Sequence, residues 1–295
     1  MQVPNEIELE WGFDTFTEAD EAYFRQFEAV EAVNYIVERS TREQIIILNE
    51  AHHKPRHRVF ARRLLQGLYD NGYRYFGLET LGNDFRDSTQ FMLDSLMQQR
   101  GYPLYSPISG TYTREPQMAN LIREAIRIGF TLFAYERDRQ GDRELIQAQN
   151  IKRKILYKDP EAKIFLYCGW YHLLEAENRG KKWMAQYLKE LSGIDPFTVY
   201  QDLLIERWCT KESPFFDMIE AKEPSLFINA EGQVYNGRAD FRHFDALLYH
   251  PRTRYVFNRP DWLQDIPENR LYQLNKQQIQ VGYPCLVKAY SLEDA

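Results

Sequence analysis

The feature that most constrains the fold is a series of short apolar runs, each of which ends at or beside a polar residue. Four runs are clear, at Gln44–Asn49, Tyr73–Glu79, Phe130–Glu136 and Lys163–Gly169. Their length and near-continuous hydrophobicity are typical of strands buried on both faces of a sheet. Three weaker strand candidates follow, at Phe197–Gln201, Ser225–Asn229 and Asp245–Tyr249.

Helical patterns lie between these runs. The clearest is an amphipathic stripe over Arg114–Ile128, with Thr113 as the predicted N-cap and Gly129 as the predicted stop. The other predicted helices are Glu18–Glu38, Arg56–Asp70, Asp84–Gln99, Arg143–Leu156 and Gly180–Leu191. Strands that alternate with helices predict an α/β fold of three layers, a mostly parallel sheet flanked by helices.

The chain of 295 residues is 44% hydrophobic, which suffices for one large core. Because no linker-like change of composition divides it, we predict a single α/β domain over residues 1–295. The motifs described below fall in a core of about 44–258. Residues 82–113 are predicted to form a helical and loop insert. Its turn-rich part, Gly101–Thr113, is expected to act as a lid or rim.

Composition excludes several classes of protein. A net charge of −6 argues against a nucleic-acid partner. No apolar run approaches the roughly 18 residues of a transmembrane helix. Cys168, Cys209 and Cys285 lie far apart and are predicted to be buried thiols. The acidic start lacks an apolar signal core, so the chain as written is expected in the cytoplasm, or outside it if a leader was removed. The sequence does not indicate an oligomeric state.

Polar side chains follow each of the four clear strands. They are Glu50, His52 and His53 after the first, Glu79 at the end of the second, Glu136 at the end of the third, and His172 after the fourth. Open parallel sheets bind ligands beyond the carboxyl ends of their strands, so these side chains are expected to meet there. Carboxylates beside imidazoles can activate water, protonate a leaving group or bind a metal.

Each of these residues also has a structural interpretation. Glu50 could cap the following turn, and Glu79 or Glu136 could pair with an arginine for structure alone. Arg114 and Arg143 each open a predicted helix, where a guanidinium could bind a substrate anion, orient a glutamate or remain solvated. His53 and His57 border a basic stretch, residues 53–58, and are expected to be exposed, whereas His243 and His250 are predicted to be structural.

Taken together, these motifs resemble the erythromycin esterase-like superfamily. That family has Gly-Glu-x-His after its first strand, which Asn49–His52 matches with Asn in place of Gly. Its second strand ends in Glu, as at Glu79, and a later strand is followed by Gly-x-x-His, as at Gly169–His172. Further matches are the helix from Arg143 to Ile151, with Gln147 where Met is usual, and the segment Phe244–Ala246.

The resemblance implies that Glu50 and His52 act as an acid–base pair, supported by Glu79 and His172. His53, Arg114, Glu136 and Arg143 are then candidates for substrate binding. Some members of this family use a divalent metal, and zinc or manganese would be ligated by Glu50, His52, Glu79 and His172. Relatives also include haem-binding iron-uptake lipoproteins and Tiki-type metalloproteases.

Three functions therefore remain open. The first is a hydrolase that cleaves an ester, lactone or amide in a small-molecule or peptide substrate with activated water. The second is a protein that binds haem or another iron-bearing ligand without catalysis, which a Soret-band titration would detect. The third is a metal-dependent peptidase, whose activity a chelator would abolish.

Overall fold

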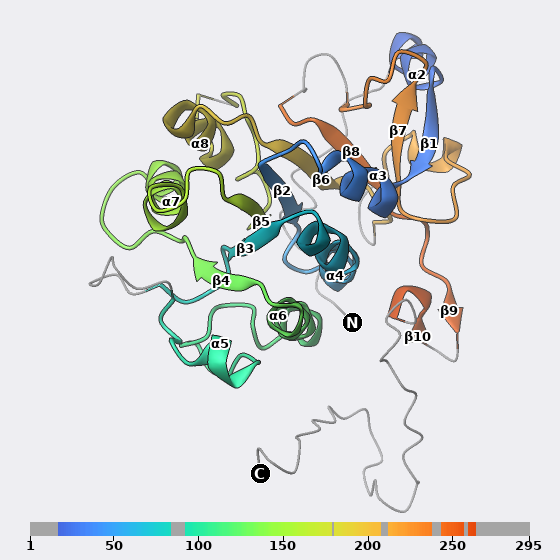
Figure 1. Ribbon diagram of the computed structural model, residues 1–295. Coiled ribbons are helices and arrows are strands. Elements are labelled where there is room, and N and C mark those ends of the chain that lie inside the picture. Colours follow the sequence, from blue (N-terminus) through green and yellow to red (C-terminus); the bar gives the residue numbers. More distant parts are fainter. Residues whose placement is uncertain are drawn as a thin grey trace, which may run out of the picture. The chain divides into compact units, whose positions relative to one another are not determined.

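The computed structural model describes residues 17–83, 92–178, 180–207, 212–237, 243–256 and 259–263 (Figure 1). Its centre is an eight-stranded sheet in the order β1-β7-β8-β6-β2-β5-β3-β4. The strands, in chain order, are β1 (Phe27–Glu31), β2 (Ile45–Glu50), β3 (Tyr73–Leu78), β4 (Thr131–Ala134), β5 (Lys163–Gly169), β6 (Phe197–Leu204), β7 (Ser225–Asn229) and β8 (Ala246–Tyr249).

Six neighbouring strands of this sheet run parallel, and the other edge is antiparallel. β2 pairs in parallel with β5 and β6, β3 with β4 and β5, and β6 with β8. β7 pairs antiparallel with both β8 and β1. The predicted mostly parallel sheet is therefore confirmed, and all seven predicted strands are present.

Helices cover both faces of the sheet, which confirms the three predicted layers. The helices α3 (Ala32–Arg39), α4 (Pro55–Asp70) and α6 (Pro116–Ile128) pack with one core cluster, and α7 (Arg143–Ile151) and α8 (Met184–Ser192) with the other. Strand β2 serves both clusters: Ile45 and Ile47 face one core, Ile46 and Leu48 the other. A strand with two buried faces has no polar face, because successive side chains alternate between the faces.

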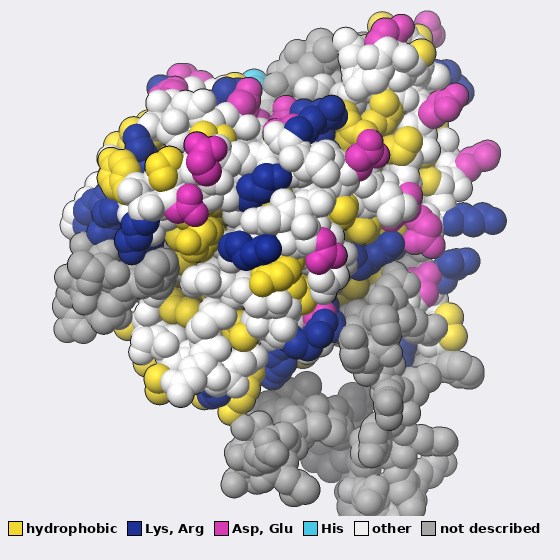
Figure 2. Space-filling model, in the orientation of Figure 1, with side chains coloured by type: hydrophobic (Ala, Val, Ile, Leu, Met, Phe, Trp, Pro, Cys, Tyr) yellow, Lys and Arg dark blue, Asp and Glu magenta, His cyan; other side chains and the backbone are white. Residues whose placement is uncertain are grey.

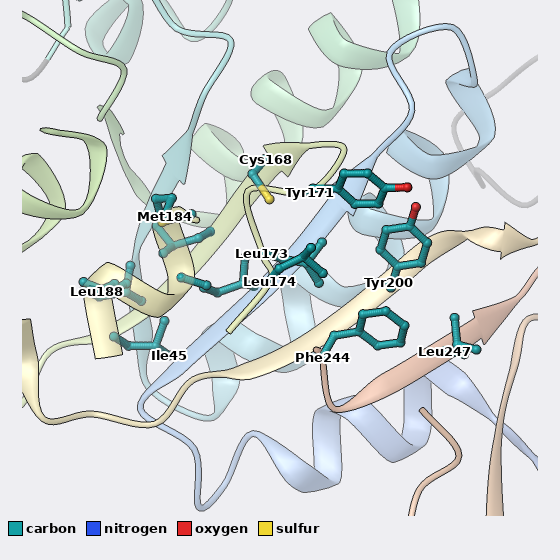
Figure 3. Packing of buried hydrophobic residues seen from close by; sticks show 14 of the residues in the cluster. Ile45, Cys168, Tyr171, Leu173, Leu174, Met184, Leu188, Tyr200, Phe244 and Leu247 are labelled. Carbon is teal, nitrogen blue, oxygen red and sulfur yellow. The ribbon is translucent and has the colours of Figure 1, made fainter. Parts of the chain in front are cut away.

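Aromatic rings form part of the core cluster that also contains Met184 and Leu188 of α8. Tyr200 stacks on Tyr171, with ring centroids 5.9 Å apart, and on Phe244 at 5.0 Å (Figure 3). Cys168 is buried in the same cluster and is a free thiol, as predicted. Cys209 and Cys285 lie outside the described residues. This stack of three rings joins the segment after β5 to strand β6 and to the residues just before β8. Three distant parts of the chain therefore share one core.

The predicted helix over Glu18–Glu38 is wrong. The structure divides it into α2 (Glu18–Phe24), strand β1 and α3. The Glu31 carboxylate accepts a hydrogen bond of 2.7 Å from the backbone N–H of Asn34, so it ends the strand and caps the next helix. Local periodicity could not reveal β1, because its backbone pairs with β7 from almost two hundred residues away.

Two other predicted helices begin later than predicted, whereas the one over Arg143–Leu156 keeps its predicted bounds. Helix α6 begins at Pro116 with Glu115 as its N-cap, not Thr113, because the Glu115 carboxylate accepts the Met118 N–H; Gly129 ends it in the left-handed conformation, as predicted. Helix α8 begins at Met184 rather than Gly180. Beyond Ile151, α7 continues as a π-helical turn, η1 (Lys152–Leu156).

The predicted helix Asp84–Gln99 falls partly on residues outside the described ranges. Near its end, the structure has the short helix α5 (Met97–Arg100). Two short strands, β9 (Tyr255–Val256) and β10 (Arg259–Pro260), and the turn η3 (Asp261–Leu263) belong to a second compact unit that starts at Tyr255. The single-domain prediction for 1–295 stays a prediction.

Within the described ranges, no helix combines the length and hydropathy that crossing a membrane requires. Figure 2 shows acidic and basic side chains interspersed over one face of the molecule. On the coloured part of that face, neither sign of charge forms an extended patch.

The order of the strands creates a crevice between β2 and β5. Strand β2 leads into α4 on one face of the sheet, whereas its neighbour β5 leads into α8 on the opposite face. Where adjacent parallel strands send their connections to opposite faces, the loops diverge and leave room for a ligand at the carboxyl ends. The polar residues predicted from the sequence follow these strands.

Candidate functional site

A pocket of about 410 Å³ opens at the carboxyl ends of β2, β3 and β5. Among its lining residues are Glu50 at the end of β2 with His52 after it, Glu79 after β3, and Gly169 at the end of β5 with His172 after it. Glu136 and Arg143 line it as well, and part of the remaining wall comes from the insert, including Pro107 and Gly110–Tyr112. Six of the eight predicted site residues therefore meet around one pocket.

Glu50 lies at the bottom of this pocket with 1% of its surface exposed. Its two carboxylate oxygens accept hydrogen bonds from Arg58 Nε at 2.6 Å and Arg58 Nη2 at 2.7 Å, a bidentate pair. His52 Nδ1 lies 2.9 Å from Glu50 Oε1. Burial alone would raise the Glu50 pKa, but the hydrogen bonds from His52 and Arg58 and the Arg58 charge outweigh it and lower that pKa. Glu50 is therefore a carboxylate at neutral pH.

The bond to Glu50 determines how His52 can act. A carboxylate accepts only, so Nδ1 carries the hydrogen in this bond and Nε2 is the nitrogen left for a substrate or water. Among the described residues, Nε2 has no hydrogen-bond partner, and 23% of the side chain is exposed. His52 is thus oriented by Glu50 and contributes to the lining of the pocket.

Gly169 allows the His52 ring to lie against β5. A Cβ atom at this position would lie 2.3 Å from His52 Cε1, 2.6 Å from His52 Nε2 and 3.2 Å from Glu79 Oε2. The basic nitrogen of His52 and the carboxylate of Glu79 therefore approach the same small volume above the glycine. Any side chain here would displace one of them.

The next residue, Trp170, has a left-handed backbone with φ of 46°. Non-glycine residues in this region are strained, and such strain often occurs at functional sites. The conformation is held by Trp170 N–H donating to Glu50 O at 2.8 Å and by Asn49 Nδ2 donating to Trp170 O at 2.8 Å. Asn49 thus ties β2 to the loop after β5.

Arg143 joins two glutamates at the pocket wall. Its Nη2 donates to Glu79 Oε1 at 2.6 Å and also to Glu136, whose oxygens lie 3.0 and 3.1 Å from Arg143 Nε. The Asp142 side chain caps the backbone N–H of Glu144, so α7 begins with Arg143 facing the pocket. Burial would raise the Glu79 pKa, but His172, Arg143 and the Gly169 N–H lower it well below its usual range.

His172 lies between two carboxylates. Its Nδ1 is 2.5 Å from Glu144 Oε2, and its Nε2 is 3.3 Å from Glu79 Oε1. Burial would lower its pKa, but Glu79 and Glu144 raise it to about 9. Arg143 Nη1 is also 3.0 Å from Nε2, but a protonated imidazole cannot accept, so we assign the Nε2 hydrogen to Glu79 and count the arginine as a neighbour.

The other two predicted site residues do not line the pocket. His53 is exposed, with its ring 5.8 Å from that of Trp170. Arg114 is exposed one residue before the cap of α6, and its guanidinium lies 5.7 Å from the ring centre of Tyr105. Their assignment to substrate binding stays a prediction.

Sequence reasoning missed three residues of the site: Arg58, Tyr112 and Glu144. Arg58 belongs to a basic stretch expected to be exposed, but it is 1% exposed and also pairs with Glu115 at 2.8 Å. Tyr112, from the turn-rich insert, stacks on His52 at 4.3 Å. Helical spacing does not place position 58 on the face of Phe60 and Leu64, so no local signal indicated the burial of Arg58.

The four predicted metal ligands make other contacts. Glu50 and Glu79 bind Arg58 and Arg143, and both nitrogens of His172 face carboxylates. The part of the chain that the structure describes has no group of three or more His, Cys, Asp or Glu side chains arranged to hold a metal ion. This arrangement does not fit a divalent ion, so the metal-ligand assignment stays a prediction and we derive no step through a metal.

Comparison with known proteins gives similarities of structure only. No family model and no curated protein sequence matches the chain. The type III effector HopBA1 is 11% identical over 77% of this chain and 98% of its own, with a TM-score of 0.42. RRSP, a toxin effector domain from Vibrio vulnificus, is 15% identical over 73% of this chain and 39% of its own, with a TM-score of 0.40.

ChaN of Campylobacter jejuni, whose structure shows cofacial haem binding, is 10% identical over 76% of this chain and 96% of its own, with a TM-score of 0.40. Similarities at this level concern the general α/β fold. They assign neither a family nor an activity, and membership of the erythromycin esterase-like superfamily stays a prediction.

Proposed function

We propose that this protein is a hydrolase in which His52 activates a water molecule to attack an ester, lactone or amide carbonyl. The observation that carries the proposal is that Glu50 orients His52 in the lining of the pocket. Glu50 accepts its Nδ1–H, and Nε2 faces the pocket beside Gly169 without a partner among the described residues. A positioned imidazole is the most common general base in enzymes.

Glu50 is the positioning residue of this pair and not its base. Both of its oxygens already accept hydrogen bonds from Arg58 or His52, and its lowered pKa makes proton uptake unfavourable. Its role resembles that of any buried carboxylate that orients an imidazole and stabilises the imidazolium formed when the proton arrives. Before the proton reaches His52, the Arg58 guanidinium compensates the buried negative charge of Glu50.

The opposite wall supplies positive charge. Arg143 uses Nε and Nη2 for the glutamates, and its Nη1 donates to none of the described carboxylates. That nitrogen is suited to donate to a carbonyl oxygen as negative charge develops on it. His172 directs both of its N–H groups to carboxylates. It therefore positions Glu79 and contributes positive charge at this wall of the pocket.

The reaction then needs only the residues of this pocket. Water loses a proton to His52 Nε2 and bonds to the carbonyl carbon, and the carbonyl oxygen becomes an oxyanion near Arg143. Collapse of this intermediate breaks the bond to the leaving group, which takes the proton from His52. The products are a carboxylic acid and an alcohol or amine, and His52 returns to its neutral form.

The test is hydrolysis of p-nitrophenyl acetate, dihydrocoumarin and a fluorogenic casein by wild type, His52→Ala and Glu50→Gln. We expect turnover of at least one probe, with kcat reduced at least 100-fold by His52→Ala and by a smaller factor in Glu50→Gln. His243→Ala, a histidine away from the pocket, is the matched control and should retain activity. Wild type that hydrolyses none of the probes, or His52→Ala with full activity, would contradict the proposal.

A further inference from the structure

The turn-rich insert contributes a side chain that sequence reasoning did not assign to the site. Tyr112 lines the pocket, and its ring stacks on His52 with centroids 4.3 Å apart and planes inclined by 21°. Arg58 lies 5.7 Å from the centre of the same ring. The ring therefore contacts both partners of the Glu50 carboxylate.

Three contacts hold the backbone of this segment at the end of β3. Thr111 N–H donates to Thr80 O at 2.9 Å, and Tyr112 N–H donates to Thr80 Oγ1 at 2.9 Å. Gly110, with φ of 143°, permits this approach, because a Cβ there would lie 2.1 Å from Thr80 O. Thr80 directly follows Glu79, so Tyr112 is fixed relative to the carboxylate that Arg143 and His172 hold.

The downstream end of the insert is fixed as well. Glu115 accepts a hydrogen bond from Arg58 Nη1 at 2.8 Å and caps α6 through the Met118 N–H. Tyr112 thus lies between two anchors, three residues from Glu115 and two from Gly110. The insert is a wall of the site, bonded to the same groups that position His52.

The Tyr112 hydroxyl lies in the field of four charged groups of the site, Glu50, Glu79, Arg58 and Arg143. Burial, Glu79 and Glu50 raise its pKa, while Arg58 and Arg143 oppose that rise. The phenol is therefore protonated at neutral pH and able to donate. Among the described residues, no hydrogen bond is made by this hydroxyl; the polar contacts of Tyr112 come from its backbone.

We propose that Tyr112 is a catalytic residue of this site, whose phenol hydroxyl donates a hydrogen bond to the oxyanion formed when water adds to the substrate carbonyl. The inference rests on the proposed hydrolase function. The step transfers no proton from Tyr112: the hydroxyl donates as the carbonyl oxygen gains charge, and the bond weakens when the intermediate collapses. Tyr112 and Arg143 Nη1 would form the two donors that such sites use.

Tyr112→Phe separates this role from simple packing, because it keeps the ring on His52 and removes only the oxygen. We expect kcat to fall about 100-fold on the best probe ester, the usual cost of losing one oxyanion donor, with KM within about twofold and an unchanged melting temperature. Tyr105→Phe is the matched control, since this exposed tyrosine of the same insert does not line the pocket. It should match wild type.

The outcomes distinguish the two proposals. Wild-type kcat in Tyr112→Phe, together with an inactive His52→Ala, would overturn the role of Tyr112 and leave the hydrolase intact. A rise in KM alone would also overturn it, because that result indicates binding of the ground state. Wild type without turnover of any probe would overturn the hydrolase and this assignment together.

Discussion

Two groups of buried carboxylates occur at opposite ends of the sheet, and they handle their charge differently. At the carboxyl ends, Glu50 is held by Arg58 and Glu79 by Arg143 and His172, and both pKa values are lowered. At the amino ends of β6 and β8, Glu175 and Asp245 lie together around Thr198, and both pKa values are raised.

The second group has a hydroxyl between its carboxyls in place of a buried cation. Thr198 Oγ1 lies 2.6 Å from Glu175 Oε1 and 3.2 Å from Asp245 Oδ2, which also accepts the Thr198 N–H at 2.8 Å. Lys189, which contacts Glu175, is partly exposed and also pairs with Asp195. Burial and the neighbouring Asp245 raise the Glu175 pKa to about 8.

The comparison separates two uses of a buried acid. Carboxylates paired with fixed cations keep their charge and their geometry across the neutral range, which a site that must orient a base requires. Carboxyls that share a proton hold segments together only while one of them is protonated. The first group lies around the pocket, and the second joins the segment after β5 to β6 and β8.

The largest expected effect comes from breaking the fixed pairing. Arg58→Met leaves Glu50 buried without its cation, and loss of one partner of a buried pair costs roughly 3–5 kcal/mol. The free energy of unfolding, measured by urea titration at pH 7, should fall by about that amount. Arg62→Met on the same helix, whose ion pair with Glu124 spans 3.4 Å, should change it by less than about 1 kcal/mol. Equal losses in the two variants would refute the distinction.

The next largest expected effect is the loss of protein stability at high pH as His172 loses its proton. Its folded pKa of about 9 lies above the usual value of 6.5, so its contribution is full below pH 6.5 and is lost as the pH rises through 9. The shift corresponds to roughly 3 kcal/mol between these limits. Urea titrations of wild type and His172→Gln from pH 6 to 10 check this. The variant should lack most of that decline, and parallel curves would contradict the assignment.

The smallest expected effect concerns the carboxyl pair. Glu175 has a raised folded pKa, so its contribution is full below its unfolded value of 4.5 and is lost as the pH rises through about 8. Asp245→Asn removes the neighbouring charge and keeps an oxygen for the Thr198 N–H. The variant should be more stable than wild type at pH 8.5, by about 1–2 kcal/mol, with little difference at pH 5. A variant less stable at both values would show that the pair shares no proton.

The fold could be predicted to the extent that each strand carries its own signal. Runs such as those at β2 and β5 are apolar at every position because both faces are buried, and this is visible locally. Strand β1 was missed because five residues of mixed character become a strand only when β7 is available to pair with them. Helix α6 was predicted, but its first residue was not. That position depends on which side chain, here Glu115, accepts the backbone N–H of the first turn.

The candidate site was predictable in part for the same reason. Topology requires residues that follow parallel strands to gather at one edge, so Glu50, His52, Glu79 and His172 could be named from their positions alone. Arg58 and Tyr112 could not, because one belongs to a basic stretch and the other to a turn-rich loop. Their burial and stacking result from contacts between distant segments.

The sequence by itself determined the three-layer architecture and the residue types at the carboxyl edge of the sheet. The reason is that hydrophobic periodicity, and the order in which strands and helices alternate along the chain, can be read from the sequence. Only the tertiary structure decided which charges pair. Arg58 pairs with Glu50, Arg143 joins Glu79 to Glu136, and His52 Nε2 has no hydrogen-bond partner among the residues that the structure describes. The physical reason is that electrostatic and hydrogen-bond energies depend on distances of a few ångströms in a buried environment, which spacing along the chain does not specify.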